Sequence, residues 1–145
     1  YRGRFKLLCQ AVHADVELGI HLCYGDLDAK HGIEPESLAK AVELANLIVS
    51  ASPRPVNYIH MPVPISRDDD AYFAPLRDLK FPPETELYLG LVHFSDGVEG
   101  ALRRMHAASK FRAEYGIASE CGLGRCKSPN MVREILRIHS EAARN

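Results

Sequence analysis

The chain lacks a long apolar segment, because no run approaches the roughly 18–20 residues that a membrane-spanning helix needs. Its N-terminus lacks the charged, apolar and small-residue regions that form a secretory signal. It also lacks net charge, because 18 Lys and Arg face 19 Asp and Glu, and the basic residues are scattered. These absences argue against a membrane protein and against binding to nucleic acid, and favour a cytoplasmic enzyme or binding domain.

Cysteine is scarce and has no dense framework spacing, so we expect free thiols or metal thiolates rather than structural disulfides. The four cysteines are Cys9, Cys23, Cys121 and Cys126. The composition is that of one globular domain spanning residues 1–145. Because the chain begins at Tyr1 rather than Met, we expect a processed protein or part of a longer one.

Four short segments of β character recur with a helical pattern between them. They start 40, 30 and 30 residues apart, which is the length of a strand, a helix and two loops. The segments are Val16–Cys23, Val56–Val63, Glu86–His93 and Gly116–Cys121. This alternation predicts an α/β fold of parallel β/α units with right-handed crossovers, and strand ends of mixed polarity fit a barrel.

The helices are predicted from their period and their caps. Residues 34–50 place Pro35 in a first turn and put four apolar residues on one face: Leu38, Val42, Ala45 and Val49. The acidic residues of the segment Arg67–Asp70 predict a cap for a short helix near 71–79, and Asp96 and Ser128 are the expected N-caps of the next two helices. Those two helices span 97–114 and 129–143, and residues 1–13 could form the tail of another.

Reactive side chains fall at the ends of all four predicted strands. The ends carry, in chain order, His21 with Cys23, then His60, then His93, then Glu120 with Cys121. Ligands of parallel α/β folds bind at the carboxyl ends of the strands, so we expect these groups to share one face. A lone His or Cys is usually structural, but this convergence favours a site. Cys9 and Cys126 keep the structural interpretation.

His21 and Cys23 are two residues apart on a strand, so their side chains can bind one ion. With Cys121 as a third ligand, two thiolates and an imidazole select zinc over magnesium or calcium. The fourth position would be open, as in catalytic zinc sites, or filled by His60 or Glu120. After Cys121 a glycine-rich turn leads to Arg125, whose side chain can bind an anion. Tyr24 and Asp26, which follow Cys23, either contact substrate or form a turn with a helix cap.

Four stretches carry a family resemblance: HLCYGD at 21–26, HMPVP at 60–64, LGLVHFSDGVEG at 89–100 and ECGLGR at 120–125. The sequence resembles the C-terminal barrel of cobalamin-independent methionine synthase, within the superfamily that includes uroporphyrinogen decarboxylase. The resemblance implies that His21, Cys23 and Cys121 hold zinc. The further glutamate ligand of that family falls at His60, which changes the ligand set.

The resemblance implies methyl transfer to a zinc-activated, homocysteine-like thiol. His60, Asp26 and His93 would be catalytic, and Tyr24, Glu120 and Arg125 would contact substrate. One alternative is a metal-free decarboxylase or lyase acting on a carboxylated substrate. The other is a non-catalytic half-barrel that assembles with a partner, because fold resemblance does not carry activity with it.

Four β/α units correspond to the C-terminal half of an eight-stranded (β/α)8 barrel. Such a half leaves open sheet edges, and we expect Ile20, Ile59 and Leu91 to face the barrel interior without an opposite wall. We therefore expect either a missing barrel half elsewhere in a longer chain or partner, or a homo-oligomer.

Overall fold

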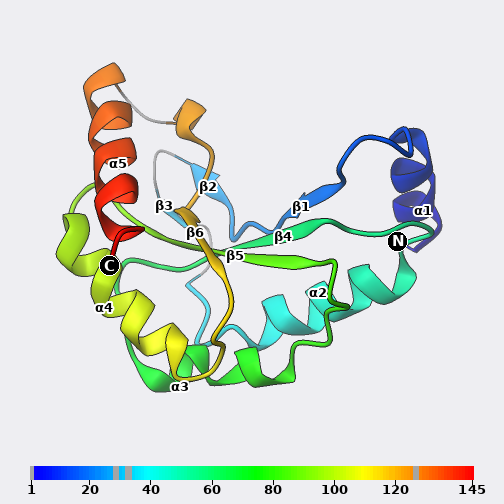
Figure 1. Ribbon diagram of the computed structural model, residues 1–145, viewed down its shortest axis with the longest axis horizontal. Helices are drawn as coiled ribbons and strands as arrows, with labels where there is room; N and C mark the ends of the chain where they lie inside the picture. Colours follow the sequence, from blue (N-terminus) through cyan, green and yellow to red (C-terminus); the bar gives the residue numbers. More distant parts are fainter. Residues whose placement is uncertain (1, 28–29, 32–33, 126–127) are drawn as a thin grey trace.

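The computed structural model describes residues 2–27, 30–31, 34–125 and 128–145, and its centre is a four-stranded parallel sheet. The strand order is β1-β4-β5-β6, with every neighbouring pair parallel (Figure 1). The strands are β1 (Gly19–His21), β4 (Tyr58–Pro62), β5 (Glu86–Val92) and β6 (Gly116–Ser119). The predicted alternation of parallel strands with helices is therefore confirmed. A small antiparallel pair, β2 (Asp26–Leu27) and β3 (Lys30–His31), follows β1.

Helices cover one face of the sheet and flank the other. In Figure 1, α2, α3 and α4 lie below the sheet, whereas α1 and α5 rise at opposite sides of the upper face. Their bounds are α1 Arg2–Ala11, α2 Ala39–Ala51, α3 Asp70–Phe73, α4 Gly97–Ser109 and α5 Pro129–Ala142, with 3₁₀ helices at Ala74–Asp78 and Leu123–Arg125.

Two predicted caps form as expected and one does not. The carboxylate of Asp69 accepts from the backbone N–H of Tyr72, and Ser128 Oγ accepts from that of Met131. Asp96 precedes α4, but its carboxylate accepts no hydrogen bond from the backbone of the helix start and pairs with Arg104 instead. Helix α2 starts later than predicted, because the N–H of Leu38 donates to the carbonyl of Tyr72, outside the helix.

The core lies between the sheet and the covering helices. Leu38, Val42 and Ala45 of the predicted apolar helix face are buried there. Ile59 and Leu91 are also fully buried in this layer, so the expectation that they face a barrel interior is wrong. Alternate residues of a strand point to opposite faces, and these apolar side chains point to the face that the helices cover. Packing against the helices removes them from contact with water. Cys9 is buried too, as a structural cysteine should be.

Arg104 is the largest fully buried side chain and joins three parts of the structure. Its guanidinium donates to the carbonyls of Leu91 and Ile65, at 2.9 and 3.0 Å. It also makes a two-bond pair with the carboxylate of Asp96, at 2.7 and 2.9 Å. A buried arginine is tolerated because its donors are satisfied in this way.

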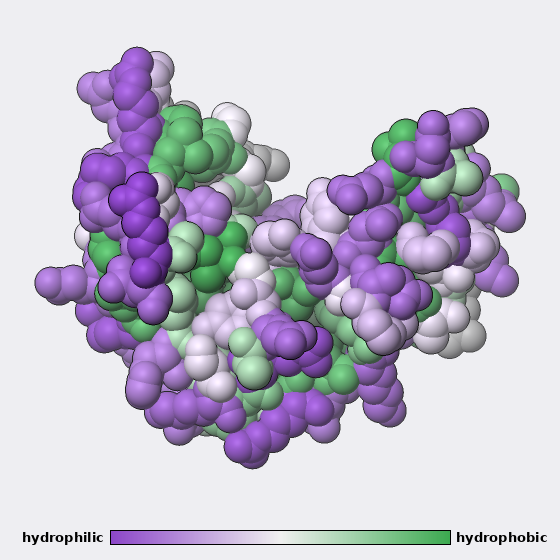
Figure 2. Space-filling model, viewed as in Figure 1, coloured by the Kyte–Doolittle hydropathy of each residue, from purple (hydrophilic) through white to green (hydrophobic). Residues whose placement is uncertain are grey.

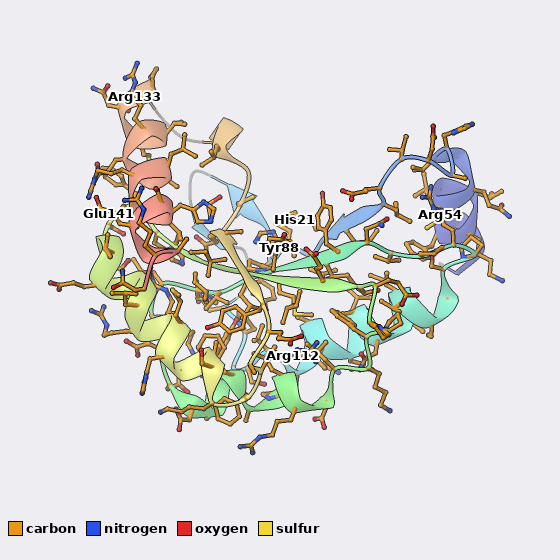
Figure 3. All side chains as sticks on the ribbon, viewed as in Figure 1. His21, Arg54, Tyr88, Arg112, Arg133 and Glu141 are labelled. Carbon is orange, nitrogen blue, oxygen red and sulfur yellow. The ribbon has the colours of Figure 1, made fainter. Side chains whose placement is uncertain are left out.

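The upper face of the sheet is left open by the covering helices. The space-filling view is hollowed between the α1 and α5 sides, above the middle of the sheet (Figure 2). His21 and Tyr88 lie on this open face, between the two flanking helices (Figure 3). Within the described residues, no helix is long and apolar enough to cross a membrane.

Candidate metal centre

His21, Cys23 and Cys121 come together at the carboxyl end of the sheet. One ligand atom from each lies within 4.8 Å of the other two, and His21 Nε2 is 3.9 Å from Cys121 Sγ. Zn–S and Zn–N bonds of about 2.3 and 2.0–2.1 Å separate the ligand atoms of a tetrahedral site by about 3.6 Å. The three side chains therefore need only small rotations to hold one ion. Cys23 and His21 are exposed, so the group is open to solvent.

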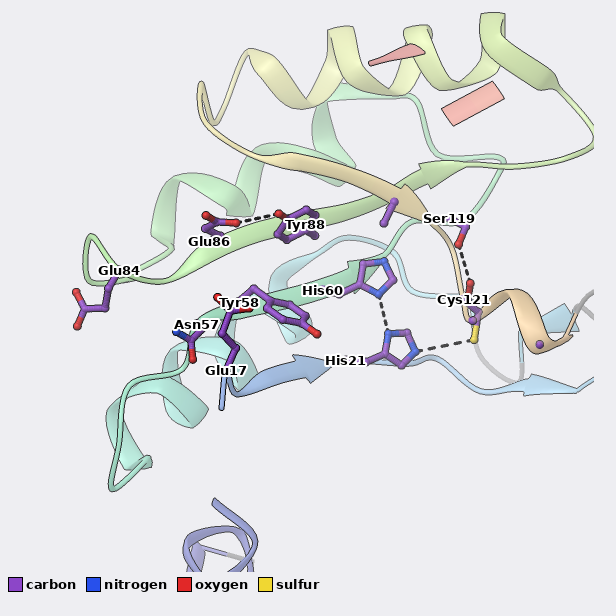
Figure 4. Close-up of a pocket in the computed structure, with 13 residues that line it drawn as sticks. Glu17, His21, Asn57, Tyr58, His60, Glu84, Glu86, Tyr88, Ser119 and Cys121 are labelled. Carbon is purple, nitrogen blue, oxygen red and sulfur yellow. Dashed lines mark hydrogen bonds between the residues drawn. The ribbon is translucent and has the colours of Figure 1, made fainter. Parts of the chain in front are cut away.

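His60 packs directly against this group from the neighbouring strand. Its ring stacks on that of His21, and the two Nδ1 atoms are 2.7 Å apart (Figure 4). The parallel register explains the contact, because His21 on β1 pairs with His60 on β4. His60 does not belong to the three-ligand group, and it contacts the side of His21 that faces away from Cys121.

Partial burial favours the neutral form of both histidines. It lowers the pKa of His21, and it lowers the pKa of His60 to about 4, with the charge of His21 adding to the effect and the Ser119 backbone opposing it. Nε2 of His60 is buried and makes no well-formed hydrogen bond with the described residues. Neutral imidazole is the form that binds a metal, so the site is prepared for a cation near neutral pH.

His93 fastens the turn that carries Cys121. It is buried at the end of β5, where its Nε2 donates to the carbonyl of Val63 at 2.8 Å. Its Nδ1 lies 3.3 Å from the carboxylate of Glu120. Since Glu120 immediately precedes Cys121, the ends of β4, β5 and β6 are tied together behind the ligand.

A cavity of about 960 Å³ opens beside the metal group on the uncovered face of the sheet. Of the predicted site residues, three line it and four do not. Those that line it are His21, His60 and Cys121, and those that do not are Cys23, His93, Glu120 and Tyr24. Tyr24 instead meets the hydroxyl of Tyr72 at 3.3 Å. The side chains of Asp26 and Arg125, and all of Cys126, lie outside the part of the chain that the structure describes.

None of the site residues predicted from the sequence lines the other end of this cavity. Its polar lining there includes Glu17, Asn57, Tyr58, Glu84, Glu86 and Tyr88. The signal was available in the strands, because Tyr58 lies two residues before His60 and therefore shares its face. Tyr88 is likewise paired with His60 across the sheet.

Comparison with known proteins finds no matching family model, no matching curated protein and no matching solved structure.

Proposed function

We propose that His21, Cys23 and Cys121 hold one zinc ion and that the chain is a zinc-dependent methyltransferase acting on a thiol. The observation that carries the proposal is the approach of an imidazole and two thiols to within 4.8 Å at the carboxyl ends of β1 and β6, the two edge strands of the sheet. Soft and borderline ligands of this kind suit zinc. The resemblance of these three positions to the zinc ligands of cobalamin-independent methionine synthase supports the same choice.

The donor set contains three protein ligands and leaves a fourth position beside the cavity. Zinc held by these residues would lower the pKa of an incoming thiol and so make that thiol a nucleophile near neutral pH. The cavity provides room for the thiol substrate and for a methyl donor on the same side of the sheet.

His60 orients His21 in this proposal. For Nε2 of His21 to bind a metal it must carry no proton, so the proton sits on Nδ1 and is donated to Nδ1 of His60. Histidine ligands generally donate their second N–H in this way, which fixes the ring and raises its basicity. His93 acts through Glu120 to position Cys121.

The reaction moves one methyl group. The thiol proton leaves to solvent, the sulfur forms a bond to the methyl carbon, and the bond from that carbon to its carrier breaks. The electron pair of the broken bond remains on the carrier. The cavity lining does not favour the alternative of a decarboxylase or lyase for carboxylated substrates. Its described residues include three glutamates and no lysine or arginine.

The architecture of the whole protein is part of the proposal. A four-stranded parallel sheet with helices on one face and an open second face fits one half of a (β/α)8 barrel, with β1 and β6 at its edges. A missing half or a second copy of the chain would then continue the sheet at those edges.

Cobalt(II) substitution tests the proposed chemistry directly. Cobalt-loaded protein should show thiolate-to-metal charge-transfer absorption that strengthens when homocysteine is added, because a third sulfur joins the metal. Methionine, which has no thiol, is the control and should leave the spectrum unchanged. A cobalt spectrum that does not respond to homocysteine would contradict thiol activation at this site.

A further inference from the structure

Three glycines build an aromatic floor on the open face of the sheet. Tyr58 pairs with Gly19 across β1 and β4, and a Cβ at Gly19 would collide with the Tyr58 ring. Tyr88 pairs with Gly116 across β5 and β6, and a Cβ there would collide with the Tyr88 ring. Each ring therefore occupies space above a neighbouring strand that only glycine leaves free, and the two rings are inclined at 75° to each other.

Gly90 makes the same kind of room for His60, whose Nε2 would be 3.1 Å from an added Cβ. The two tyrosine rings meet edge to face, with centroids 5.8 Å apart. Figure 4 shows Tyr58 and Tyr88 on the same side of the sheet as His60 and His21, and Tyr58, Tyr88, His60 and His21 line one cavity.

The floor carries negative charge at the end away from the metal group. Glu17, Glu84 and Glu86 line the cavity there, and the lining residues that the structure describes include no lysine or arginine. The hydroxyl of Tyr88 donates to Glu86 at 2.9 Å, which holds the ring and this carboxylate together.

We propose that this aromatic floor binds a small methylated cation, a quaternary ammonium or a sulfonium group. The faces of two tyrosines attract such a cation through their quadrupoles, and the nearby carboxylates add a field of the same sense. A methylated cation has no N–H to donate, so flat aromatic contact suits it better than hydrogen-bond acceptors alone would. An anionic ligand would instead meet three carboxylates.

This inference rests on the proposed function when it names the cation as the methyl donor. The thiolate sulfur forms a bond to a methyl carbon of the cation, and the bond from that carbon to nitrogen or sulfur breaks. The electron pair stays on that nitrogen or sulfur, which becomes neutral. The neutral product then loses its charge attraction to the floor, which favours release.

Calorimetric titration with choline, on chelator-treated and on zinc-loaded protein, tests the inference. Choline should bind, its neutral tert-butyl isostere should bind at least several-fold more weakly, and added salt should weaken choline binding. Tyr88→Leu should weaken choline binding roughly 3- to 30-fold, whereas Tyr88→Phe, which keeps the ring, should change it little. Circular dichroism of each variant verifies that it folds.

Equal binding of choline and its isostere would overturn the inference, since it would show apolar contact without recognition of charge. No choline binding at all would also overturn it. Zinc retention without choline binding contradicts this inference alone. Choline binding in a chain that does not retain zinc contradicts only the proposed metal chemistry.

Discussion

Gly90→Ala should destabilise the protein, because the added methyl group has no free space. The new Cβ would lie 2.9 Å from Cα of Glu120, 3.1 Å from Nε2 of His60 and 3.2 Å from Cα of Pro62. Two of these atoms belong to the backbone: Cα of Pro62 lies in β4, on one side of β5, and Cα of Glu120 follows β6, on the other side. Neither atom can move without moving its strand. Overpacking of this kind costs about 1–3 kcal/mol. Alanine also lowers the conformational entropy of the unfolded chain, which offsets about 0.4–1 kcal/mol of this loss.

The expected net loss in the free energy of unfolding is about 1–2 kcal/mol, measured by urea denaturation of metal-free protein. Gly3→Ala is the matched control, because a Cβ at Gly3 meets nothing within 4 Å. That variant should be neutral or slightly more stable. The crowding also pushes on His60 and on the residue before Cys121, so Gly90→Ala should weaken zinc retention as well. A Gly90→Ala protein as stable as the unmodified chain would refute the described packing of β5.

Three further predictions concern charge, pH and assembly. Arg104→Leu should lower the free energy of unfolding by about 3–5 kcal/mol in urea denaturation, because Asp96 loses its buried partner. Arg103→Leu removes an exposed partner of the same carboxylate and should lower it by at most about 1 kcal/mol. Equal losses would contradict the described pairing. Burial, and then the charge of His21, lowers the pKa of His60 from 6.5 to about 4, so the unfolded chain binds this proton more tightly than the folded chain does. The free energy of unfolding of metal-free protein should therefore fall by about 3 kcal/mol as the pH falls from about 6.5 to about 4. His60→Gln should flatten that part of the stability profile, and an unaltered profile would show that His60 does not titrate this way. In sedimentation, the 145-residue chain should self-associate through its open edges, and a compact stable monomer would contradict the half-barrel.

Periodicity and spacing were enough to predict the layers of this fold. The apolar repeat from Leu38 to Ala45 located the face of α2 that is buried, and evenly spaced β segments predicted the four parallel strands. What periodicity could not predict is which face of the sheet stays open. Apolar residues such as Ile59 and Leu91 fit equally well under a layer of helices and in a barrel interior, so the sequence pattern does not distinguish the two positions. Only the packing of α2, α3 and α4 against the sheet shows which face is covered.

The candidate site was predictable where chemistry repeats at strand ends. His21, Cys23 and Cys121 stood out because three metal-binding side chains ended parallel strands, and the structure brings them together. His93 had the same signal, yet it is buried and bonded to the carbonyl of Val63. A strand-end position does not say whether a ring points to the cavity or to the backbone of its neighbour, because that depends on the twist and packing of both strands.

Zinc content is the most direct test of the proposed metal centre. Protein purified without chelator should contain about one zinc per chain by elemental analysis, since two thiolates and one imidazole converge at a single point. The double variant Cys23→Ser with Cys121→Ser should retain almost none. Cys9→Ala, which changes a buried cysteine that is not in the three-ligand group, should retain the full amount. Unchanged zinc content in the double variant would contradict the metal centre described for this protein.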